Sequence, residues 1–255
     1  MEFCALASGS SGNCFFVGNG KSGILVDAGI STKQILKRMS AKHINPKSVK
    51  ALFITHEHSD HIRGADVFAR KFNVPIFATK ETAKSAFICS DENLLNIIGR
   101  KEKIKVSGLN VEAFPKSHKA AEPVSFSIFG DKIVSVITDA GYACNEITKN
   151  VSESDFLCIE SNHDEEMLEN GPYPYFLKKW IRSDIGHLSN RQAGLCVLEH
   201  ASGRLKNIML AHLSKTNNTP KIALKTFKGL IKERKNFNPK VHVSLREKPS
   251  QKIKF

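Results

Sequence analysis

The sequence predicts a layered α/β protein, because short apolar segments rich in β-formers alternate with longer segments of helical periodicity. Three apolar runs, at residues 3–7, 14–17 and 24–26, open the chain between Gly/Ser/Asn turns, which is typical of a β-meander. A further buried strand is expected to run directly into a histidine-rich segment at residue 56. No repeat, low-complexity tract or Pro/Gly linker interrupts the pattern, so one domain over residues 1–255 is expected.

The remaining elements follow from periodicity and capping residues. Ser31 has the character of an N-cap for a helix that ends near residue 43, and residues 51–54 form an apolar strand. A helix over residues 62–72, a strand over 74–78 and a helix from Lys80 come next. Strands are then expected near residues 109–114, 123–129, 132–137, 156–160 and 207–211, with helices near 174–183 and 189–201. A helix over residues 220–235 and a strand over 241–245 close the chain.

The cysteines and the hydropathy indicate a cytoplasmic protein with no membrane partner. No segment approaches the ~20 apolar residues that cross a bilayer. The six cysteines are scattered, form no C-x-x-C pair and mostly lie in apolar runs, which predicts buried thiols and no disulfides. They are Cys4, Cys14, Cys89, Cys144, Cys158 and Cys196.

The charge is strongly basic and unevenly distributed. The formal net charge is +13, and residues 215–255 carry twelve Lys/Arg against Glu233 and Glu247, which gives +10 for this segment. Such a balance favours a polyanionic partner over a small neutral substrate.

The segment His56-Glu57-His58-Ser59-Asp60-His61 carries the chemistry. Four metal-competent side chains, His56, His58, Asp60 and His61, follow a predicted strand within six residues, where they bring no packing benefit. Imidazole and carboxylate ligands suit Zn²⁺, Mn²⁺ or Fe. The alternative is a solvated loop that is rich in histidine.

The H-x-H-x-D-H spacing resembles the metallo-β-lactamase superfamily. The resemblance implies a four-layer αβ/βα sandwich of two packed sheets with helices on the outer faces, and a site for two divalent metal ions. It also implies that His56 and His58 bind one metal together with a later histidine, and that Asp60 and His61 bind the other.

The same resemblance implies the other ligands. His118 matches the third histidine, Asp139 the bridging carboxylate and His212 the last ligand. Without the resemblance, His118 would be a surface residue and Asp139 an Asx turn. An Asp rather than a Cys at the bridging position argues against β-lactam hydrolysis and favours nucleases and thioesterases.

Three further segments, at residues 6–13, 160–164 and 186–190, look like the YycJ (WalJ) branch of bacterial metallohydrolases. That branch implies exonuclease activity on double-stranded DNA. It is also similar to ribonuclease Z, which implies that Glu160 and His187 form a proton relay. Glu160 would otherwise be an exposed acid at a strand end. Lys119 departs from the relatives, which often have Asp after the third histidine, so a partner that orients this ligand is either missing or supplied elsewhere.

Two groups of residues are candidates for contacts with phosphates. Small polar side chains beside the site could donate to oxyanions, or could simply form turns. They are Ser8, Ser10, Ser11, Asn13, Ser189, Asn190, Ser214, Lys215, Asn217 and Asn218. A stripe of lysines on helix 220–235 could meet the phosphate backbone, or could be a solvated face. It consists of Lys221, Lys225, Lys228, Lys232 and Lys235.

These features predict a dinuclear phosphodiesterase that hydrolyses nucleic acid, with double-stranded DNA as the expected partner and exonuclease-like action. A water that bridges the two metals would attack the phosphate in line, with Asp60 among the ligands that hold it. His187, helped by Glu160, would protonate the leaving oxygen. The alternatives are a hydrolase of a small cyclic phosphodiester or a thioester on the same fold, and a nucleic-acid-binding protein with a decayed site.

Overall fold

A computed structural model describes all 255 residues, and the chain divides into two compact units. Unit 1 consists of residues 1–115, 120–131 and 245–255. Unit 2 consists of residues 116–119 and 132–244. The expectation of a single domain stays a prediction.

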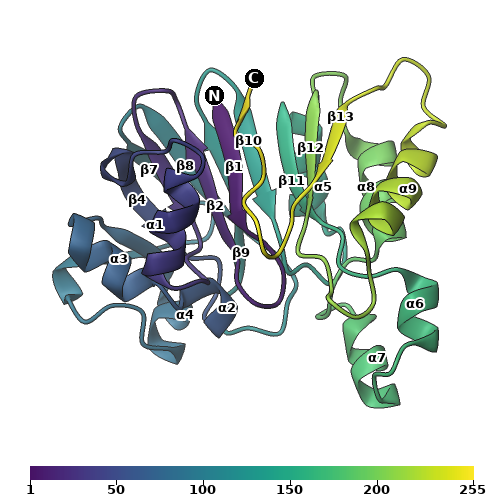
Figure 1. The fold of residues 1–255 in the computed structure, drawn as a ribbon, viewed down its shortest axis with the longest axis horizontal. Coiled ribbons are helices and arrows are strands. Elements are labelled where there is room, and N and C mark those ends of the chain that lie inside the picture. The colour runs from purple at the N-terminus through teal and green to yellow at the C-terminus, as the bar shows by residue number, and fades with distance from the viewer. The chain divides into compact units, whose positions relative to one another are not determined.

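Unit 1 is built on a seven-stranded sheet in the order β14-β1-β2-β3-β4-β5-β6. The antiparallel strands β1 (Glu2–Ala7), β2 (Cys14–Gly18) and β3 (Gly23–Val26) confirm the predicted meander. The strands β4 (Val49–Phe53), β5 (Ile76–Thr79) and β6 (Leu95–Ile98) continue it in parallel. The last strand, β14 (Ile253–Lys254), pairs with β1 at the edge, so the two termini lie side by side (Figure 1).

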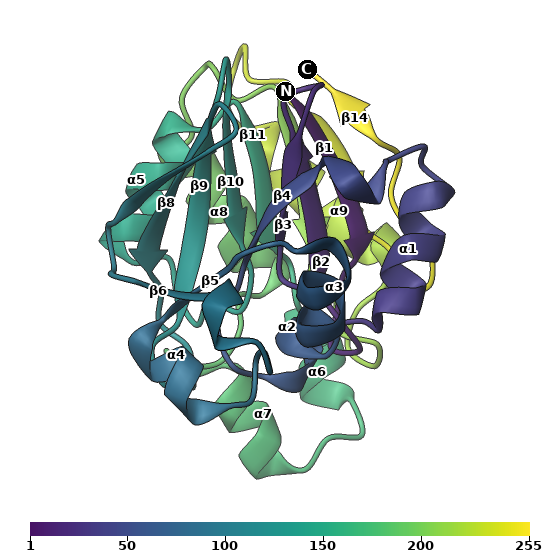
Figure 2. The ribbon, with the colours of Figure 1, turned by 90° about the vertical axis from the view of Figure 1, so that its left-hand side faces the viewer.

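Helices cover one face of this sheet. Figure 2 shows α1 (Thr32–Ser40) and α3 (Ala65–Phe72) in front of the strands, with α2 (Ser59–Ile62) and α4 (Lys80–Ser85) at one end. The predicted cap is confirmed, because the Ser31 side chain accepts a hydrogen bond from the amide of Gln34. Apolar side chains of α1 and α3, such as Ile35 and Phe68, are fully buried against those of the strands, such as Leu25. Two 3₁₀ turns, at Pro46–Ser48 and Glu92–Leu94, lead into β4 and β6.

The other strands of unit 1 form an antiparallel group. The strands β7 (Lys103–Val106), β8 (Leu109–Pro115) and β9 (Val124–Phe129) pair in sequence order. The ring of Phe53 on β4 meets that of Phe126 on β9 edge to face, with centroids 5.3 Å apart. Unit 1 therefore contains two packed layers of strands, and its helices cover one of them.

Unit 2 is built on four parallel strands. The strands β10 (Ile133–Ile137), β11 (Phe156–Glu160), β12 (Asn207–Ala211) and β13 (Lys240–Val243) pair in this order. Parallel pairing needs crossover connections, and the helices α5 (Asn145–Glu153), α8 (Asn190–His200) and α9 (Pro220–Ile231) supply them (Figure 1). Two shorter helices, α6 (Glu165–Asn170) and α7 (Tyr175–Ile181), lie between β11 and α8 in the sequence.

Several elements differ from the prediction. The periodicity did not predict α5, because only Ile147 and Val151 give it apolar buried positions. The strands β6, β7 and β14 and the helix α6 were also missed, since each has at most six residues. Helix α9 ends at Ile231 instead of residue 235, because Lys232 caps it and Asn236 is left-handed at φ 61°. Lys235 therefore lies beyond the helix that was expected to carry it.

The cysteines form no disulfide, as expected. All six are free thiols, and five of them are buried, while Cys144 is only half-buried. Burial raises the pKa of the Cys4 thiol to about 11. None of the helices is both long and apolar enough to span a membrane.

Two glycines in the paired helices α8 and α9 provide a test of the packing in unit 2. A methyl group at Gly229 would meet nothing within 4 Å, whereas one at Gly194 would lie 2.6 Å from a methyl of Leu230. Gly229→Ala should therefore raise the free energy of unfolding by about 0.5–1 kcal/mol, because alanine loses less backbone entropy in a helix. Gly194→Ala should gain less, because Leu230 must move. Urea denaturation of both variants would measure the difference, and an equal gain would contradict this packing.

Candidate metal centre

Polar side chains gather where the parallel strands of unit 2 end. Asp139 follows β10, Glu160 is the last residue of β11, and His212 follows β12. Since β10, β11 and β12 are parallel neighbours, their carboxyl ends meet at one edge of the sheet. This edge therefore brings together two acids and one histidine that are far apart in sequence.

Three residues at strand ends adopt the left-handed backbone conformation. They are Asp27 at φ 60°, Asp139 at φ 53° and His212 at φ 54°. A non-glycine residue in this region costs on the order of 1–2 kcal/mol, and such strain accumulates at functional sites. In each case the left-handed residue lies just after the end of its strand and carries a polar side chain.

In unit 2, one buried carboxylate lies among three imidazoles. Asp139 Oδ2 is 3.0 Å from His212 Nδ1, and Asp139 Oδ1 is 3.8 Å from both His118 Nε2 and His187 Nδ1. Asp139 is 2% exposed, so its charge is almost entirely removed from water. A buried charge requires a compensating partner, which a cation bound by these groups would supply.

His118 is oriented for ligation through its Nε2 atom. Its Nδ1 donates a hydrogen bond to the Gly186 carbonyl oxygen at 3.2 Å, which leaves the lone pair on Nε2. Burial lowers the pKa of His118 to about 3, so the ring is neutral at pH 7, the form that binds metals. The Gly186 carbonyl thus takes the orienting role that Lys119 cannot fill. The Lys116 ammonium also donates to the Thr138 carbonyl, which joins this loop to the Asp139 turn.

Glu160 and His187 form a direct pair. The Nδ1 of His187 donates to Glu160 Oε1 at 2.8 Å. The other oxygen of Glu160 accepts from the amides of Ala140 at 2.9 Å and Leu188 at 3.1 Å. Glu160 is fully buried and is not the exposed acid of the alternative interpretation. The ring edge of Trp180 on α7 packs against His187, with centroids 5.5 Å apart at 89°.

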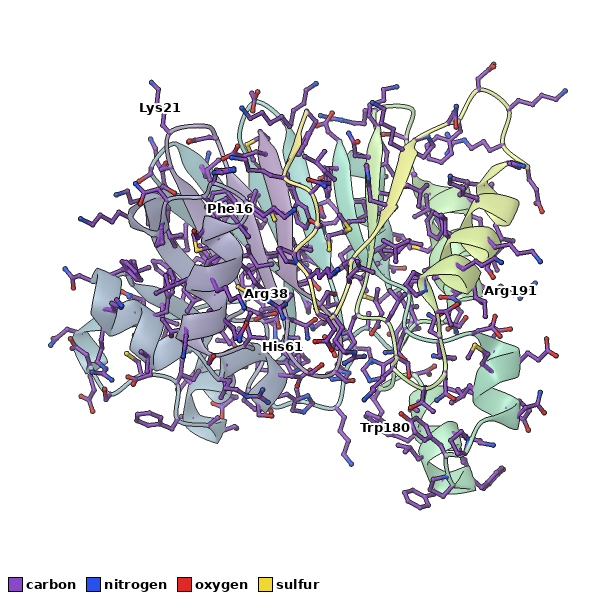
Figure 3. All side chains as sticks on the ribbon, in the orientation of Figure 1. Phe16, Lys21, Arg38, His61, Trp180 and Arg191 are labelled. Carbon is purple, nitrogen blue, oxygen red and sulfur yellow. The ribbon has the colours of Figure 1, made fainter.

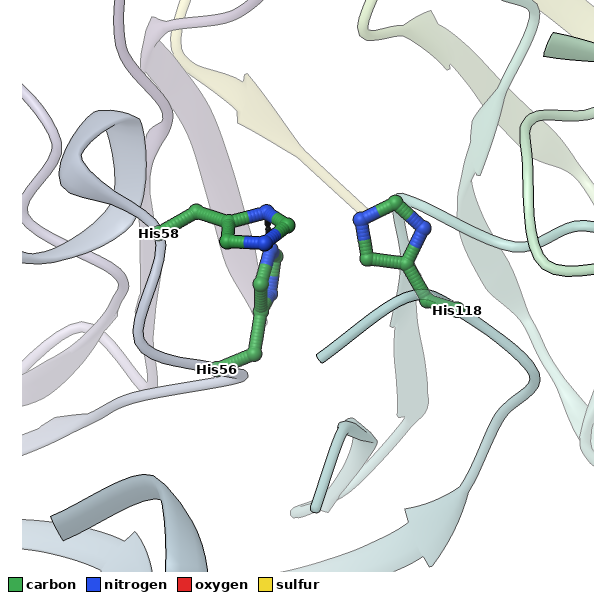
Figure 4. Close-up of side chains that lie close together, drawn as sticks. All are labelled: His56, His58 and His118. Carbon is green, nitrogen blue, oxygen red and sulfur yellow. Dashed lines mark hydrogen bonds between the residues drawn. The ribbon is translucent and has the colours of Figure 1, made fainter. Parts of the chain in front are cut away.

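In unit 1, the histidine-rich segment forms a compact group. The Nε2 of His56 lies 3.0 Å from Nδ1 of His58 (Figure 4), and the rings of His56 and His61 have centroids 4.0 Å apart. His61 belongs to α2, which begins directly after His58, so the turn of this helix brings Asp60 and His61 back toward the strand end. Asp60 Oδ2 is 3.5 Å from His61 Nε2.

Asp27 contacts a candidate metal ligand, although the sequence motifs did not reveal it. Its Oδ2 accepts from Nδ1 of His61 at 2.7 Å and from the Thr55 hydroxyl at 2.9 Å, while its Oδ1 accepts from the Thr55 amide. Both Asp27 and His61 are fully buried (Figure 3 labels His61). The carboxylate therefore fixes the ring so that Nε2 carries the lone pair. No sequence motif marks this role, because it depends on the parallel pairing of β4 with β3, the strand that Asp27 follows.

Several of the residues that were predicted to contact phosphates are buried. Asn13 is fully buried, and its amide faces His61 Nε2 at 3.1 Å. Asn190 donates to Asn218, which itself donates to the carbonyls of Ser161 and Asn162. Ser189 caps α8 in a capping box and also donates to Glu165. These side chains bond to other groups of the protein, and their contact with a phosphate stays a prediction. Asn217 is likewise buried at 1% exposure, and Ser8 at 3%.

Some candidates stay accessible. Ser10, Ser11 and Lys215 are exposed, while Ser214 is half-buried and its hydroxyl accepts from the Asn217 amide in a turn. Arg246, which the sequence did not single out, donates to the hydroxyl oxygens of Ser10 at 3.2 Å and Ser11 at 2.6 Å. Lys221, Lys225, Lys228 and Lys232 are all exposed, opposite the buried side chains of α9.

The donor atoms fit divalent metals. Unit 1 offers His56, His58, Asp60 and His61, and unit 2 offers His118, Asp139 and His212. In both His61 and His118 the protein occupies Nδ1, so a metal would bind each ring through Nε2, which in His61 lies 3.1 Å from the Asn13 amide nitrogen. Neutral imidazoles with carboxylates suit Zn²⁺, Mn²⁺ or Fe, whereas sites built for Mg²⁺ or Ca²⁺ rely on oxygen ligands.

Comparison with known proteins assigns the family. Residues 7–133 match the metallo-β-lactamase superfamily model. The chain is 35% identical over 241 residues to exodeoxyribonuclease YycJ of Bacillus anthracis, covering 92% of this chain and 90% of that protein. The chain belongs to the metallo-β-lactamase superfamily and is a metal-dependent hydrolase, as its site predicted. Within that superfamily it is also similar to exodeoxyribonuclease WalJ of Streptococcus pneumoniae, at 37% identity over 88% of this chain and 85% of that one.

Solved structures confirm the predicted fold class. The metallo-β-lactamase fold protein YhfI of Bacillus subtilis superposes with a TM-score of 0.71 at 14% identity, over 98% of each chain. The short form of human tRNase Z superposes with a TM-score of 0.65 at 13% identity, also over 98% of each chain. At these identities the likeness shows the fold alone.

The contact between Asp27 and His61 predicts that Asp27 affects metal affinity, although it is not itself a proposed ligand. Asp27→Ala should weaken metal binding about 10- to 100-fold, because the His61 ring loses the acceptor that fixes its tautomer and orientation. Competition with a fluorescent chelator would measure the affinity. Asp66→Asn is the control, since Asp66 pairs with Arg70 on α3 at 2.7 Å and should leave metal binding unchanged. Equal affinities in wild type and Asp27→Ala would contradict the orienting role.

Proposed function

We propose that this protein is a two-metal phosphodiesterase that hydrolyses DNA, with exonuclease-like action. The observation that carries the proposal is the buried Glu160–His187 pair beside the carboxylate of Asp139. In this pair, His187 would protonate the leaving group next to the proposed metal ligand Asp139. Its relatives YycJ and WalJ are exodeoxyribonucleases by name, and they match the chain along most of its length.

The ligand assignment joins the donors of both units. In the proposal, His56, His58 and His118 hold one ion, and Asp60, His61 and His212 hold the other. Asp139 would serve as a ligand to both. Bound divalent ions would neutralise charge on a phosphate and lower the pKa of a water molecule toward neutrality. The orienting contacts of His61 with Asp27 and of His118 with Gly186 support this assignment.

The chain's own residues handle the proton. His187 donates Nδ1–H to Glu160, so its Nε2 is the atom that can carry a proton to the leaving oxygen. The Glu160 carboxylate stabilises the imidazolium form, and two backbone amides hold that carboxylate in place. His187 is 11% exposed at its side chain, which permits access to a substrate while limiting solvent.

The charge favours DNA over a small diester or a thioester. Hydrolysis of a small substrate needs only the metal ligands and the proposed acid, so a small substrate would not explain the basic stripe of α9. The exposed lysines Lys221, Lys225, Lys228 and Lys232 have no acid on their face of the helix. Such a stripe suits the phosphate backbone, which binds basic surfaces without sequence preference. Action on double-stranded DNA in the cytoplasm completes the proposal.

Removing the proposed acid should separate chemistry from metal binding. His187→Ala should lower turnover of a DNA substrate about 10²- to 10⁴-fold, because a general acid contributes on this scale, and should keep the wild-type metal content. Turnover of labelled duplex and metal content by mass spectrometry measure both effects. His200→Ala is the control, because His200 lies on the surface of α8 and is 43% exposed at its side chain. Loss of metal from His187→Ala would make His187 a ligand and overturn its role as the acid.

The lysine stripe should determine how strongly duplex binding depends on salt concentration. Replacing Lys221, Lys225, Lys228 and Lys232 with Gln should weaken duplex binding and flatten the slope of log K against log salt by ~0.9 for each phosphate that the protein no longer neutralises. Hydrolysis of bis(p-nitrophenyl) phosphate should stay intact, because this diester is too small to reach α9.

A matched control carries the same change of net charge elsewhere. Lys33, Lys47, Lys50 and Lys71 are exposed lysines of unit 1, and their replacement with Gln should change the slope less. An unchanged slope in the α9 variant would make the stripe a solvated face.

A further inference from the structure

Four large apolar side chains of unit 2 are exposed, and we refer to these four residues together as the apolar rim: Tyr142, Tyr175, Phe176 and Ile185. Tyr175 and Phe176 are 79% and 72% exposed, which is unusual for aromatic side chains in a folded protein. All four lie in the segments that carry Asp139 and His187.

The rim is bonded to the candidate site. The amide of His187 donates to the Ile181 carbonyl at the end of α7, and the amide of Lys119 donates to the Ile185 carbonyl. A methyl group at Gly141, beside Tyr142, would overlap the Asp184 carbonyl oxygen, so the turn after β10 and the turn before His187 touch. The segments that carry the rim thus contact the segments that carry His118, Asp139 and His187.

Helix α7 aligns aromatic and basic side chains. Phe176 and Trp180 are four residues apart, so they lie on the same side of the helix one turn apart. Trp180 in turn packs against His187 (Figure 3 labels Trp180). Lys179 is exposed and lies one turn from Tyr175, and the helix contains no acidic residue. Aromatic faces therefore run from the outer end of α7 toward the proposed acid, with a cation beside them.

We propose that the apolar rim is a stacking site for unpaired bases of a nucleic-acid strand, adjoining the phosphodiesterase site. The inference rests on the proposed function for the identity of the ligand. Bases have apolar faces that stack on aromatic rings without regard to sequence, and Lys179 complements the phosphates between them. The rim selects frayed or single-stranded ends, so it supplies a preference for DNA ends that the lysine stripe of α9 lacks.

The test is a binding experiment that needs no hydrolysis. A duplex with a short unpaired end carrying 2-aminopurine, and the same duplex with a blunt end, are titrated with the full-length protein in EDTA. Wild type should prefer the tailed duplex about tenfold or more and quench the 2-aminopurine fluorescence, as stacking predicts. Tyr175→Ala with Phe176→Ala should lose both the preference and the quenching, while blunt-duplex binding stays unchanged. Tyr175→Phe with Phe176→Tyr keeps both rings and should behave as wild type.

The outcomes separate the two proposals. Equal binding of tailed and blunt duplexes by wild type, or quenching that survives in the alanine variant, overturns the stacking site. Sedimentation that shows a wild-type dimer and a monomeric alanine variant also overturns it, because the rim would then contact a second copy of the chain. If the tailed preference is present but wild type with Mn²⁺ hydrolyses no DNA, the proposed function fails and the stacking site stands. If DNA is hydrolysed without a tailed preference, the reverse holds.

Discussion

The site depends on one constraint: ionisable side chains at the ends of buried strands are removed from water. Asp27, Asp139 and Glu160 are each at most 2% exposed. A carboxylate in such surroundings is strongly destabilised unless donors or cations surround it. Each of these acids has polar neighbours. Asp27 accepts from a histidine and a threonine, Glu160 accepts from two amides and a histidine, and imidazoles surround Asp139. The bonds to Asp27 and Glu160 fix the tautomer and orientation of the His61 and His187 rings.

The same constraint explains the local strain. Asp27, Asp139 and His212 leave their strands in the left-handed conformation, which polar side chains tolerate better than branched apolar ones. In unit 2, the chain turns just after β10 and β12, and this keeps Asp139 and His212 together, with Asp139 Oδ2 3.0 Å from His212 Nδ1. The cost in backbone energy is offset by the paired buried groups.

The sequence predicted the elements with strong periodicity or strong chemistry. The meander of β1 to β3, the buried strands of unit 2 and the strand-end positions of His56, Asp139, Glu160 and His212 are all observed. Short or polar elements such as α5, α6 and β14 were missed, because their stability comes from packing against distant segments instead of from a local pattern. Asp27 was missed for a related reason. Its role depends on the parallel pairing of β3 with β4, which no single motif records.

Small polar residues were the least predictable. Asn13, Ser189 and Asn190 follow the composition of a phosphate-binding loop, yet the structure uses them as buried caps and bridges. Serine and asparagine make short hydrogen bonds to backbone as readily as to a ligand, so their sequence position alone cannot distinguish the two uses. Arg246 shows the converse case, since only the fold brings it to Ser10 and Ser11.

The central claim is that the donors of both units hold two divalent ions that are required for hydrolysis of DNA. The most direct test is the metal stoichiometry of the full-length protein, measured by mass spectrometry after loading with Mn²⁺ or Zn²⁺ and removal of excess metal, alongside its hydrolysis of labelled duplex. We expect two ions per chain, loss of hydrolysis when a chelator removes them, and recovery when they are restored. Hydrolysis that persists in the metal-free protein, or a protein that retains no metal, would contradict it.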